Sequence, residues 1–307
     1  MESILRQLIL AIALAVTPIT VCAQDWNQGA DAYENGDYAT ALQEWKPLAE
    51  QGDSSAQYML GHMYLNGEGQ PLNYAEAAKW YELAAEQGDA EAQHNLGYMY
   101  ENGIGAIQDH AKAAKWYRLA AEQSLAIAQN NLGKMYASGQ GIPQDHSEAA
   151  KWIKLAAEQG YSIAQSSLGV MHSTGQGVPQ DHAEAVKWWK LAGEQGLAIA
   201  QVYLGDSYRK GTGAPQDYVK AIKWYRLAAE QGQAYAQLNL GNRYYRGQGV
   251  PRSNLIAHMW YNIANANGLE DAGGYRDLLA ADMTPDDISE AQRNARVCVA
   301  SDYKDCD

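Results

Sequence analysis

The strongest constraint on this chain is a fixed internal period, because one residue pattern returns every 36 positions. Six copies follow one another without an insertion or deletion, and each contains an Ala-Gln pair, a Leu-Gly pair and a later tryptophan. The six tryptophans are Trp80, Trp116, Trp152, Trp188, Trp224 and Trp260. A constant period of about 20 to 50 residues is typical of solenoids, in which each repeat packs only on its neighbours. The period therefore predicts a solenoid.

Each repeat is predicted to form two helices. In the first copy, apolar residues around Leu60 and Tyr64 recur three and four positions apart, which indicates an amphipathic helix. The Gly- and Asn-rich stretch 66–71 ends that helix. Residues 74–87 then carry a second apolar stripe, which includes Ala77 and Trp80. Two such short helices cannot bury both stripes alone, so we expect an all-α fold in which stacked repeats share one continuous core.

The expected helix ends carry their own signals. Asn73 stands where the second helix needs an N-cap, and four later copies place aspartate there. These aspartates are Asp109, Asp145, Asp181 and Asp217. Three copies have a glutamate three residues later, which predicts reciprocal capping boxes; these are Glu76, Glu148 and Glu184.

Two glycine positions also predict local structure. Gly61 lies inside the first helix, where glycine costs about 1 kcal/mol relative to alanine. Its recurrence in every copy therefore predicts a helix crossing too close for a Cβ atom. Gly88 follows the second helix, where a left-handed residue favours glycine. Ser124 replaces it in the second copy, so we expect a less relaxed turn there.

Residues 1–23 have the layout of a secretory signal. Arg6 precedes an apolar run at 8–16, and small residues lead up to Ala23, after which we expect cleavage. Cys22 leaves a lipoprotein as an alternative, although Val21 is too large for the residue before a lipidated cysteine. The run is too short to span a bilayer comfortably, so the mature chain is expected to be exported, periplasmic or secreted, with no membrane span.

The segments that flank the repeats are predicted to act as caps. Residues 24–53 form a shortened helix pair with a tight turn at 35–37, before the repeats at 54–268. In 269–307 the repeat pattern decays, until Thr284 and Pro285 begin a last helix that runs to about Val299. Cys298 and Cys306 are the cysteines that remain after cleavage, and an oxidising compartment predicts a disulfide between them. A thiol pair or a bridge to a partner is the alternative.

The repeat resembles a known family. The segment Leu60-Gly61-x-x-Tyr64 followed by Ala77-x-x-Trp80 is similar to the tetratricopeptide repeat. Its length, the Gly67-x-Gly69 loop and the ending Ala84-Ala85-Glu86-Gln87-Gly88 resemble the Sel-one-like repeat. The C-terminal segment with Met283-Thr284-Pro285 and Ala291-Gln292 resembles the tail of its bacterial secreted members. The resemblance implies a right-handed α-α superhelix that binds proteins as an adaptor in signalling, envelope or host-contact pathways. One subset of this family has a disulfide in every repeat and is linked to binding penicillin-like compounds. No repeat of this chain contains cysteine, so the chain departs from that subset.

Other functions find little support in the sequence. A net charge of −13 disfavours nucleic acid and anionic membranes as partners. The Gly-x-Gly loops follow helices rather than strands, so no dinucleotide cofactor is expected. Equivalent residues of stacked helices lie too far apart to share a metal, which applies to His110, His146 and His182. Ser301 and Lys304 match an S-x-x-K pattern without its companion motifs. We expect no enzyme; the alternatives are a cell-wall enzyme or penicillin-interacting protein and a structural envelope component.

The remaining candidate is a groove that binds a protein or an extended peptide. If the packing follows the resemblance, the first helices line the concave face, and positions 55, 58, 62, 65, 66 and their equivalents are exposed. The predicted groove residues are Tyr58, His62, Glu91, His94, Tyr98, Glu101, Arg209, Lys210, Tyr235, Asn242, Tyr245 and Arg246, with Asp206 beside them. One end is aromatic and acidic, the other aromatic and basic, and tyrosine and arginine are enriched at binding hot spots. The basic end predicts a partner with an acidic segment.

Overall fold

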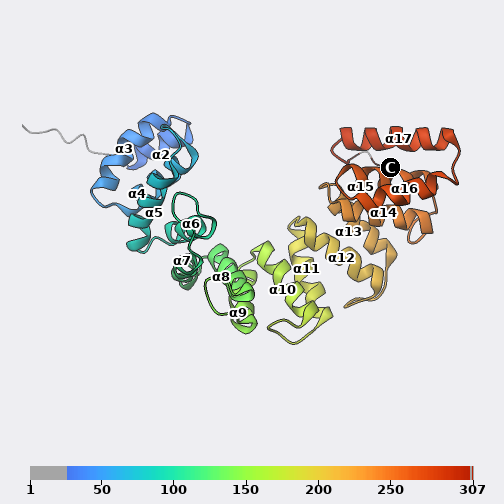
Figure 1. Cartoon of the computed structure of the whole chain (residues 1–307), viewed down its shortest axis with the longest axis horizontal. Coiled ribbons are helices and arrows are strands. Elements are labelled where there is room, and N and C mark those ends of the chain that lie inside the picture. Colours follow the sequence, from blue (N-terminus) through green and yellow to red (C-terminus); the bar gives the residue numbers. More distant parts are fainter. Residues whose placement is uncertain (1–25, 305, 307) are drawn as a thin grey trace, which may run out of the picture. The chain divides into compact units, whose positions relative to one another are not determined.

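The computed structural model describes residues 26–304 and Cys306, and the regular elements of this part of the chain are all helices, joined by short loops (Figure 1). The helices of the N-terminal half are α2 (Trp26–Glu34), α3 (Tyr38–Glu50), α4 (Ser54–Asn66), α5 (Tyr74–Glu86), α6 (Ala90–Asn102), α7 (His110–Glu122), α8 (Ala126–Ser138) and α9 (His146–Glu158). Those of the C-terminal half are α10 (Ser162–Thr174), α11 (His182–Glu194), α12 (Ala198–Lys210), α13 (Tyr218–Ala229), α14 (Ala234–Arg246), α15 (Asn254–Ala266), α16 (Glu270–Ala280) and α17 (Pro285–Ala300). The all-α prediction is confirmed. The predicted signal segment lies outside the described residues.

The helices form two compact units, one up to residue 119 and one from residue 120 onward. In the first unit, α2 pairs with α3 and α4 pairs with α5, while α3 packs on α4 and α5 on α6. In the second unit the pairs are α8 with α9, α10 with α11, α12 with α13 and α14 with α15. Successive pairs pack through α9 and α10, α11 and α12, and α13 and α14. Within each unit the helix pairs therefore stack as expected of a solenoid.

The glycine inside each first helix lies directly against an aromatic ring or an aliphatic side chain. A Cβ added to Gly61 would stand 2.6 Å from the Tyr81 ring, and one added to Gly205 would stand 2.5 Å from the Tyr225 ring. Gly133 is equally close to Ile153. Real Cβ atoms do not approach other carbon atoms this closely, so the predicted close crossing is confirmed.

The predicted N-caps are confirmed, but the capping boxes are only half formed. The Asp181 carboxylate accepts hydrogen bonds from the N–H groups of residues 183 and 184 at the start of α11. Its own N–H donates to the carbonyl of His172 in α10 at 2.8 Å, so no donor remains for Glu184. Glu184 instead forms an ion pair with Lys187 at 2.7 Å. Asn73 and Asp145 repeat this arrangement, which joins the two helices of a repeat.

Buried glutamines connect one repeat to the next. The Gln165 side-chain amide donates to the carbonyl of Ala157 at the end of α9, at 3.2 Å. Its side-chain oxygen accepts from Gln195, which caps the end of α11, at 2.7 Å. We call this pair of hydrogen bonds, repeated along the chain, the glutamine ladder. Gln165 comes from the recurring Ala-Gln pair and Gln195 from the recurring Glu-Gln-Gly segment, which explains why the two segments recur together.

The C-terminal cap contains one more helix than the sequence predicted. α16 occupies residues 270–280, where Gly273 and Gly274 interrupt the apolar pattern. It forms because it packs on α15, which also contacts α17. Thr284 caps α17 and Pro285 is its first residue, as predicted. A disulfide joins Cys298 to Cys306, and both cysteines are buried in the core that contains Trp260.

Candidate functional site

In the first unit, the predicted groove residues are held by contacts inside the chain. His62 contacts the Tyr33 hydroxyl at 3.1 Å and the Glu68 carboxylate at 3.3 Å. Tyr33 also donates to Glu68 at 2.9 Å, which makes a compact polar cluster at the N-terminal cap. In the next repeat, Tyr117 donates to Glu101 at 2.6 Å. Only the exposed side chains of Glu91 and Tyr98 keep the open surface that the prediction required.

The expectation that position 58 and its equivalents are exposed is wrong. The Tyr58 ring is half buried and lies 5.7 Å from the ring of Tyr81. His94 is only 9% exposed and lies 5.6 Å from Tyr117. Tyr58 and His94 each contact the tyrosine that packs on the glycine of the same first helix. The position therefore points toward the second helix of its own repeat and not toward solvent. Burial also lowers the pKa of His94.

In the second unit, Asp206 neutralises part of the predicted basic end. Arg209 donates from Nε and Nη2 to Asp206 at 3.1 Å, and Lys210 lies 3.3 Å from the other carboxylate oxygen. Tyr225 donates to the same carboxylate at 2.5 Å and accepts from Arg209. Tyr235 completes the cluster at 3.4 Å. Arg209, Lys210 and Tyr235 therefore lie together around a carboxylate of the chain itself.

The ionisation of Asp206 follows from these contacts. Burial alone would raise its pKa, but the hydrogen bond from Tyr225 and the charges of Arg209 and Lys210 outweigh burial. Its pKa is therefore lower than usual, and the carboxylate stays charged. Burial and the same carboxylate raise the pKa of Tyr225, so its hydroxyl remains a donor.

The other predicted residues of the second unit lie on α14. Asn242 accepts a hydrogen bond of 3.0 Å from the Tyr261 hydroxyl on α15, so this contact joins the two helices of the repeat. Tyr245 is exposed, and the guanidinium of Arg252 lies over its ring, 5.5 Å from the ring centre. Arg246, in the last turn of α14, is exposed too. Tyr245 and Arg246 thus remain open to a partner.

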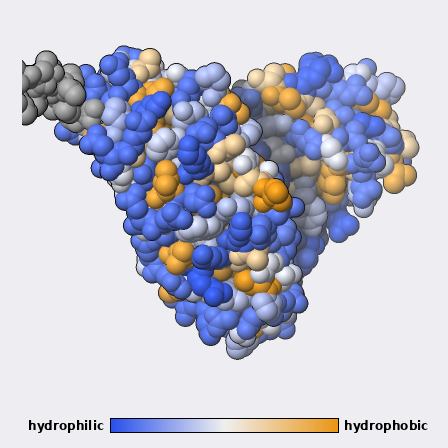
Figure 2. Space-filling view, turned by 60° about the vertical axis from the view of Figure 1, so that its left-hand side comes forward, coloured by the Kyte–Doolittle hydropathy of each residue, from blue (hydrophilic) through white to orange (hydrophobic). Residues whose placement is uncertain are grey.

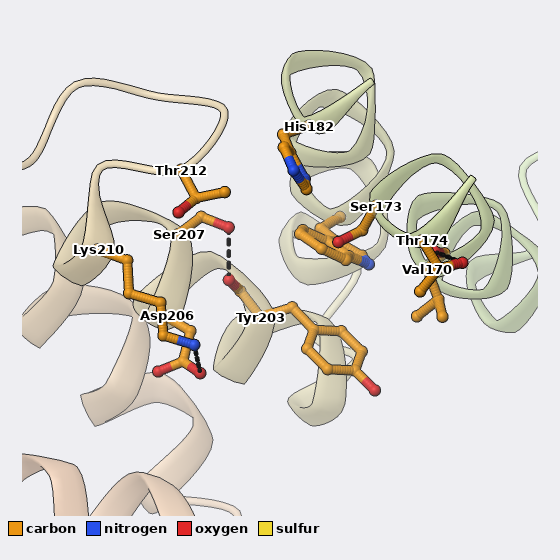
Figure 3. A pocket seen from close by; sticks show the side chains of 10 residues that line it. Val170, Ser173, Thr174, His182, Tyr203, Asp206, Ser207, Lys210 and Thr212 are labelled. Carbon is orange, nitrogen blue, oxygen red and sulfur yellow. Dashed lines mark hydrogen bonds and ion pairs between the residues drawn. The ribbon is translucent and has the colours of Figure 1, made fainter. Parts of the chain in front are cut away.

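A pocket of about 390 Å³ opens beside Asp206, between α10, α11 and α12 (Figure 3). Trp189 and Tyr203 supply its aromatic wall, with ring centres 4.9 Å apart. The other lining residues are Val170, Ser173, Thr174, His182, Asp206, Ser207, Lys210 and Thr212. The pocket combines aromatic surface with hydroxyl groups and one ammonium group, a mixture typical of ligand pockets.

The pocket lies where two neighbouring repeats depart from the common pattern. Ser207 occupies a position that four other copies fill with a buried methionine, and its hydroxyl donates to the Tyr203 carbonyl at 2.8 Å. Trp189 replaces the tyrosine or isoleucine of the other copies, and Tyr203 replaces a methionine, serine or asparagine. The smaller side chain leaves space, and the two larger rings form a wall beside it. The sequence prediction included Asp206 and Lys210 but missed these three residues.

The same methionine position holds Arg243 in the last repeat. Arg243 is 4% exposed, and its Nε has no acceptor among the described residues. Its guanidinium lies over the ring of Tyr218, 5.4 Å from the ring centre. The stretch 231–269 around it contains three arginines and no aspartate or glutamate. Comparing the copies position by position reveals this substitution, but the prediction treated the position as core.

No three His, Cys, Asp or Glu side chains in the described part of the chain are grouped to hold a metal ion. No described helix is long and apolar enough to cross a membrane. Ser301 donates its hydroxyl to the Cys298 carbonyl at 2.9 Å, which occupies it inside the C-terminal turn. Hydrophobic residues on the face shown in Figure 2 are scattered rather than gathered into one patch.

A recurring cleft lies on the side of the second helices. It holds Trp116, Tyr100 and Leu119 in the first unit, with a volume of about 490 Å³. The cleft of about 600 Å³ in the second unit is lined by the equivalent Trp224, Tyr208 and Leu227. Because the two clefts have the same residues at these positions, they reflect how repeats stack and distinguish no single repeat.

Comparisons with known proteins agree with the repeat architecture. The crystal structure of a Sel1 repeat protein from Oxalobacter formigenes has 34% identity to this chain, covers 79% of this chain and 97% of its own, and gives a TM-score of 0.71. The structure of a protective antigen present in uropathogenic Escherichia coli strains, which displays an SLR fold, has 25% identity, covers 91% and 85%, and gives 0.51. No curated protein matches the chain. The family model described as Sel1 repeat matches residues 54–89, 90–125, 126–161, 162–197, 198–233 and 234–269, so the chain belongs to the Sel1 repeat family.

Proposed function

We propose that this protein is a scaffold that binds another protein or an extended peptide on the first-helix surface of its second unit. The observation that carries the proposal is the pocket beside Trp189, Tyr203 and Ser207. The residues that hold the repeats together are kept from copy to copy, whereas these three depart from the pattern together at one place. We infer that this shared departure, which leaves a pocket beside the rings, serves binding.

The chemistry of this surface favours an extended partner with both apolar and acidic groups. Tyr203 and Tyr245 offer aromatic contact area, which dominates the energy of many interfaces. Arg209 and Lys210 share the charge of Asp206, so they attract an acidic segment less than the sequence suggested. An acidic segment of the partner should instead be attracted to the end of α14, where the charge of Arg246 is exposed. Such charges mainly set the association rate and the specificity.

We further propose that the protein acts in the bacterial envelope or outside the cell, without catalysis of its own. The signal-like segment 1–23 and the disulfide between Cys298 and Cys306 support export. One structural relative is described as a protective antigen, which is compatible with the same location. A fluorescent penicillin should not label the purified protein; stoichiometric labelling that disappears in Ser301→Ala would overturn the non-catalytic proposal.

Site-specific photocrosslinking tests the binding surface. A benzophenone amino acid is placed at Tyr245 on α14 or at Leu155 on α9, and the two side chains are similarly exposed, at 41% and 45%. Both positions lie in the second unit, but Leu155 belongs to a second helix. Crosslinks to one partner from position 245, and not from 155, in cells of the source organism would support the proposal. The reverse pattern would place the partner on the second-helix side and overturn it.

A further inference from the structure

Arg243 is the least expected side chain in the molecule. Four other copies have a buried methionine at this position, namely Met63, Met99, Met135 and Met171. Arg243 is buried almost as completely as those methionines, yet it carries a guanidinium. Its neighbours on α14 and α15 cannot neutralise it, because neither helix contains an acidic residue.

Arg243 is therefore poorly compensated in the structure. Removing a charge from water costs several kcal/mol unless a counter-ion and hydrogen bonds replace the lost hydration. The Tyr218 ring offsets part of that cost through a cation–π contact. Burial lowers the pKa of Arg243, and the positive charges of Arg209 and Arg246 lower it further. These charges lie on α12 and α14 and share one region of the second unit.

The acids on α12 and at the start of α13 do not serve Arg243, since Asp217 caps α13 and pairs with Lys220. Asp206 is already bound by Arg209, Lys210, Tyr225 and Tyr235. Its two oxygens thus satisfy other donors, and Arg243 Nε has no acceptor among the described residues. The region carries a local excess of positive charge on a chain whose net charge is −13.

We propose that Arg243 and Arg246 form a binding site for the side-chain carboxylate of an acidic peptide segment. A planar guanidinium matches a carboxylate through two parallel hydrogen bonds, and Arg246, one turn away on the same helix, extends the site to the surface. The carboxylate would supply the counter-ion that the chain lacks. A phosphate group shares this chemistry, but its second charge costs more to remove from water. The proposal rests on the scaffold function and names the chemistry of its partner.

The repeat itself provides the decisive variant. Arg243→Met restores the residue that four other copies contain, so it should fold and should raise the Tm. A fluorescent hexaglutamate peptide is the probe, and its affinity for the full-length mature protein is measured by anisotropy. Arg243→Met should weaken binding about tenfold or more, which corresponds to about 1.4 kcal/mol. Arg243→Lys keeps the charge but not the planar fork, so it should recover only part of the affinity.

Arg252→Met is the matched control, because it removes the same charge from an exposed side chain of the same segment. It should leave affinity within about twofold of wild type, as expected for a charge at the rim. Hexaglutamine should not bind, and inorganic phosphate at the peptide's concentration should not displace hexaglutamate. Equal affinity of Arg243→Met and wild type, a lower Tm in that variant, or efficient displacement by phosphate would each overturn the carboxylate site. If crosslinks from position 245 persist in that case, the scaffold function stands while this site falls.

Discussion

Gln195, at the end of α11, donates a hydrogen bond of 2.7 Å to the side-chain oxygen of Gln165, thirty residues earlier on α10. Gln165 in turn donates to the carbonyl of Ala157 in the preceding repeat. The buried Gln165 side chain is thus hydrogen-bonded both to the C-terminal end of α9 in the preceding repeat and to Gln195, the C-cap of α11 in its own repeat. The equivalent Gln57, Gln129, Gln201 and Gln237 do the same, so the ladder couples neighbouring repeats.

Replacing Gln165 by methionine should destabilise the protein by about 0.5–1.5 kcal/mol, because it removes the buried hydrogen bond from Gln165 to the Ala157 carbonyl and the one from the Gln195 amide to Gln165. The free energy of unfolding in urea measures the effect. Gln176→Met is the control, since Gln176 is exposed in a loop and should change stability little. An equal loss in both variants would show that the ladder contributes nothing specific.

Gly205 and Gly274 should respond to alanine in opposite directions. A Cβ at Gly205 would meet the Tyr225 ring at 2.5 Å, so Gly205→Ala should lower stability by about 1–3 kcal/mol, as overpacking does. Gly274 lies in α16 with open space around it, so Gly274→Ala should raise stability by about 0.5–1 kcal/mol through helix propensity. Thermal unfolding of the two variants gives the signs directly, and a stable Gly205→Ala protein would contradict the close crossing.

Ser124→Gly should stabilise the second unit. Ser124 has a φ of +67°, in the left-handed region, where the other repeats have glycine. A non-glycine residue in this region costs about 1–2 kcal/mol, part of which glycine gives back as chain entropy in the unfolded state. We expect a net gain of about 0.5–1 kcal/mol. Gly160→Ser, the reverse change at an equivalent turn with φ of +89°, should lose a similar amount. A Tm that does not rise in Ser124→Gly would show that the turn is unstrained.

The fold could be predicted because its determinants are local and repeated. The period, the N-caps and the glycine of the close crossing each occur in short sequence windows. The capping boxes were half wrong because the N–H of Asp181 finds its acceptor in another helix, at His172. α16 was missed because packing on α15 outweighs the cost of Gly273 and Gly274 in a helix.

The site could be predicted only in part. Residues that vary at exposed positions located Asp206, Lys210 and Arg246, but not the ion pairs that Asp206 forms. The spacing of Asp206 and Arg209, three apart on one helix, could have indicated the pair. The pocket depends on Trp189 and Ser207, which come from neighbouring helices, and no local pattern connects them. Comparing equivalent positions between copies finds both, and finds Arg243 as well.

Asp206→Asn should change stability and ligand attraction in opposite directions. At neutral pH the variant should be less stable by about 1–2 kcal/mol, because Arg209 and Lys210 lose their shared counter-ion at a half-buried position. The folded-state pKa of Asp206 lies below its ordinary value of 3.8. The stabilisation is therefore complete above that value and disappears as the pH falls through the folded-state pKa.

Urea unfolding at neutral pH and at pH values below that ordinary aspartate pKa should consequently show a smaller acid-induced loss for Asp206→Asn than for wild type. Asp282→Asn, at an exposed position, should behave like wild type. The same substitution frees Arg209 and Lys210 to act with Arg246, so the association rate of hexaglutamate should rise and depend more steeply on salt. A variant that loses stability without faster association would show that the charge at this surface does not guide the ligand.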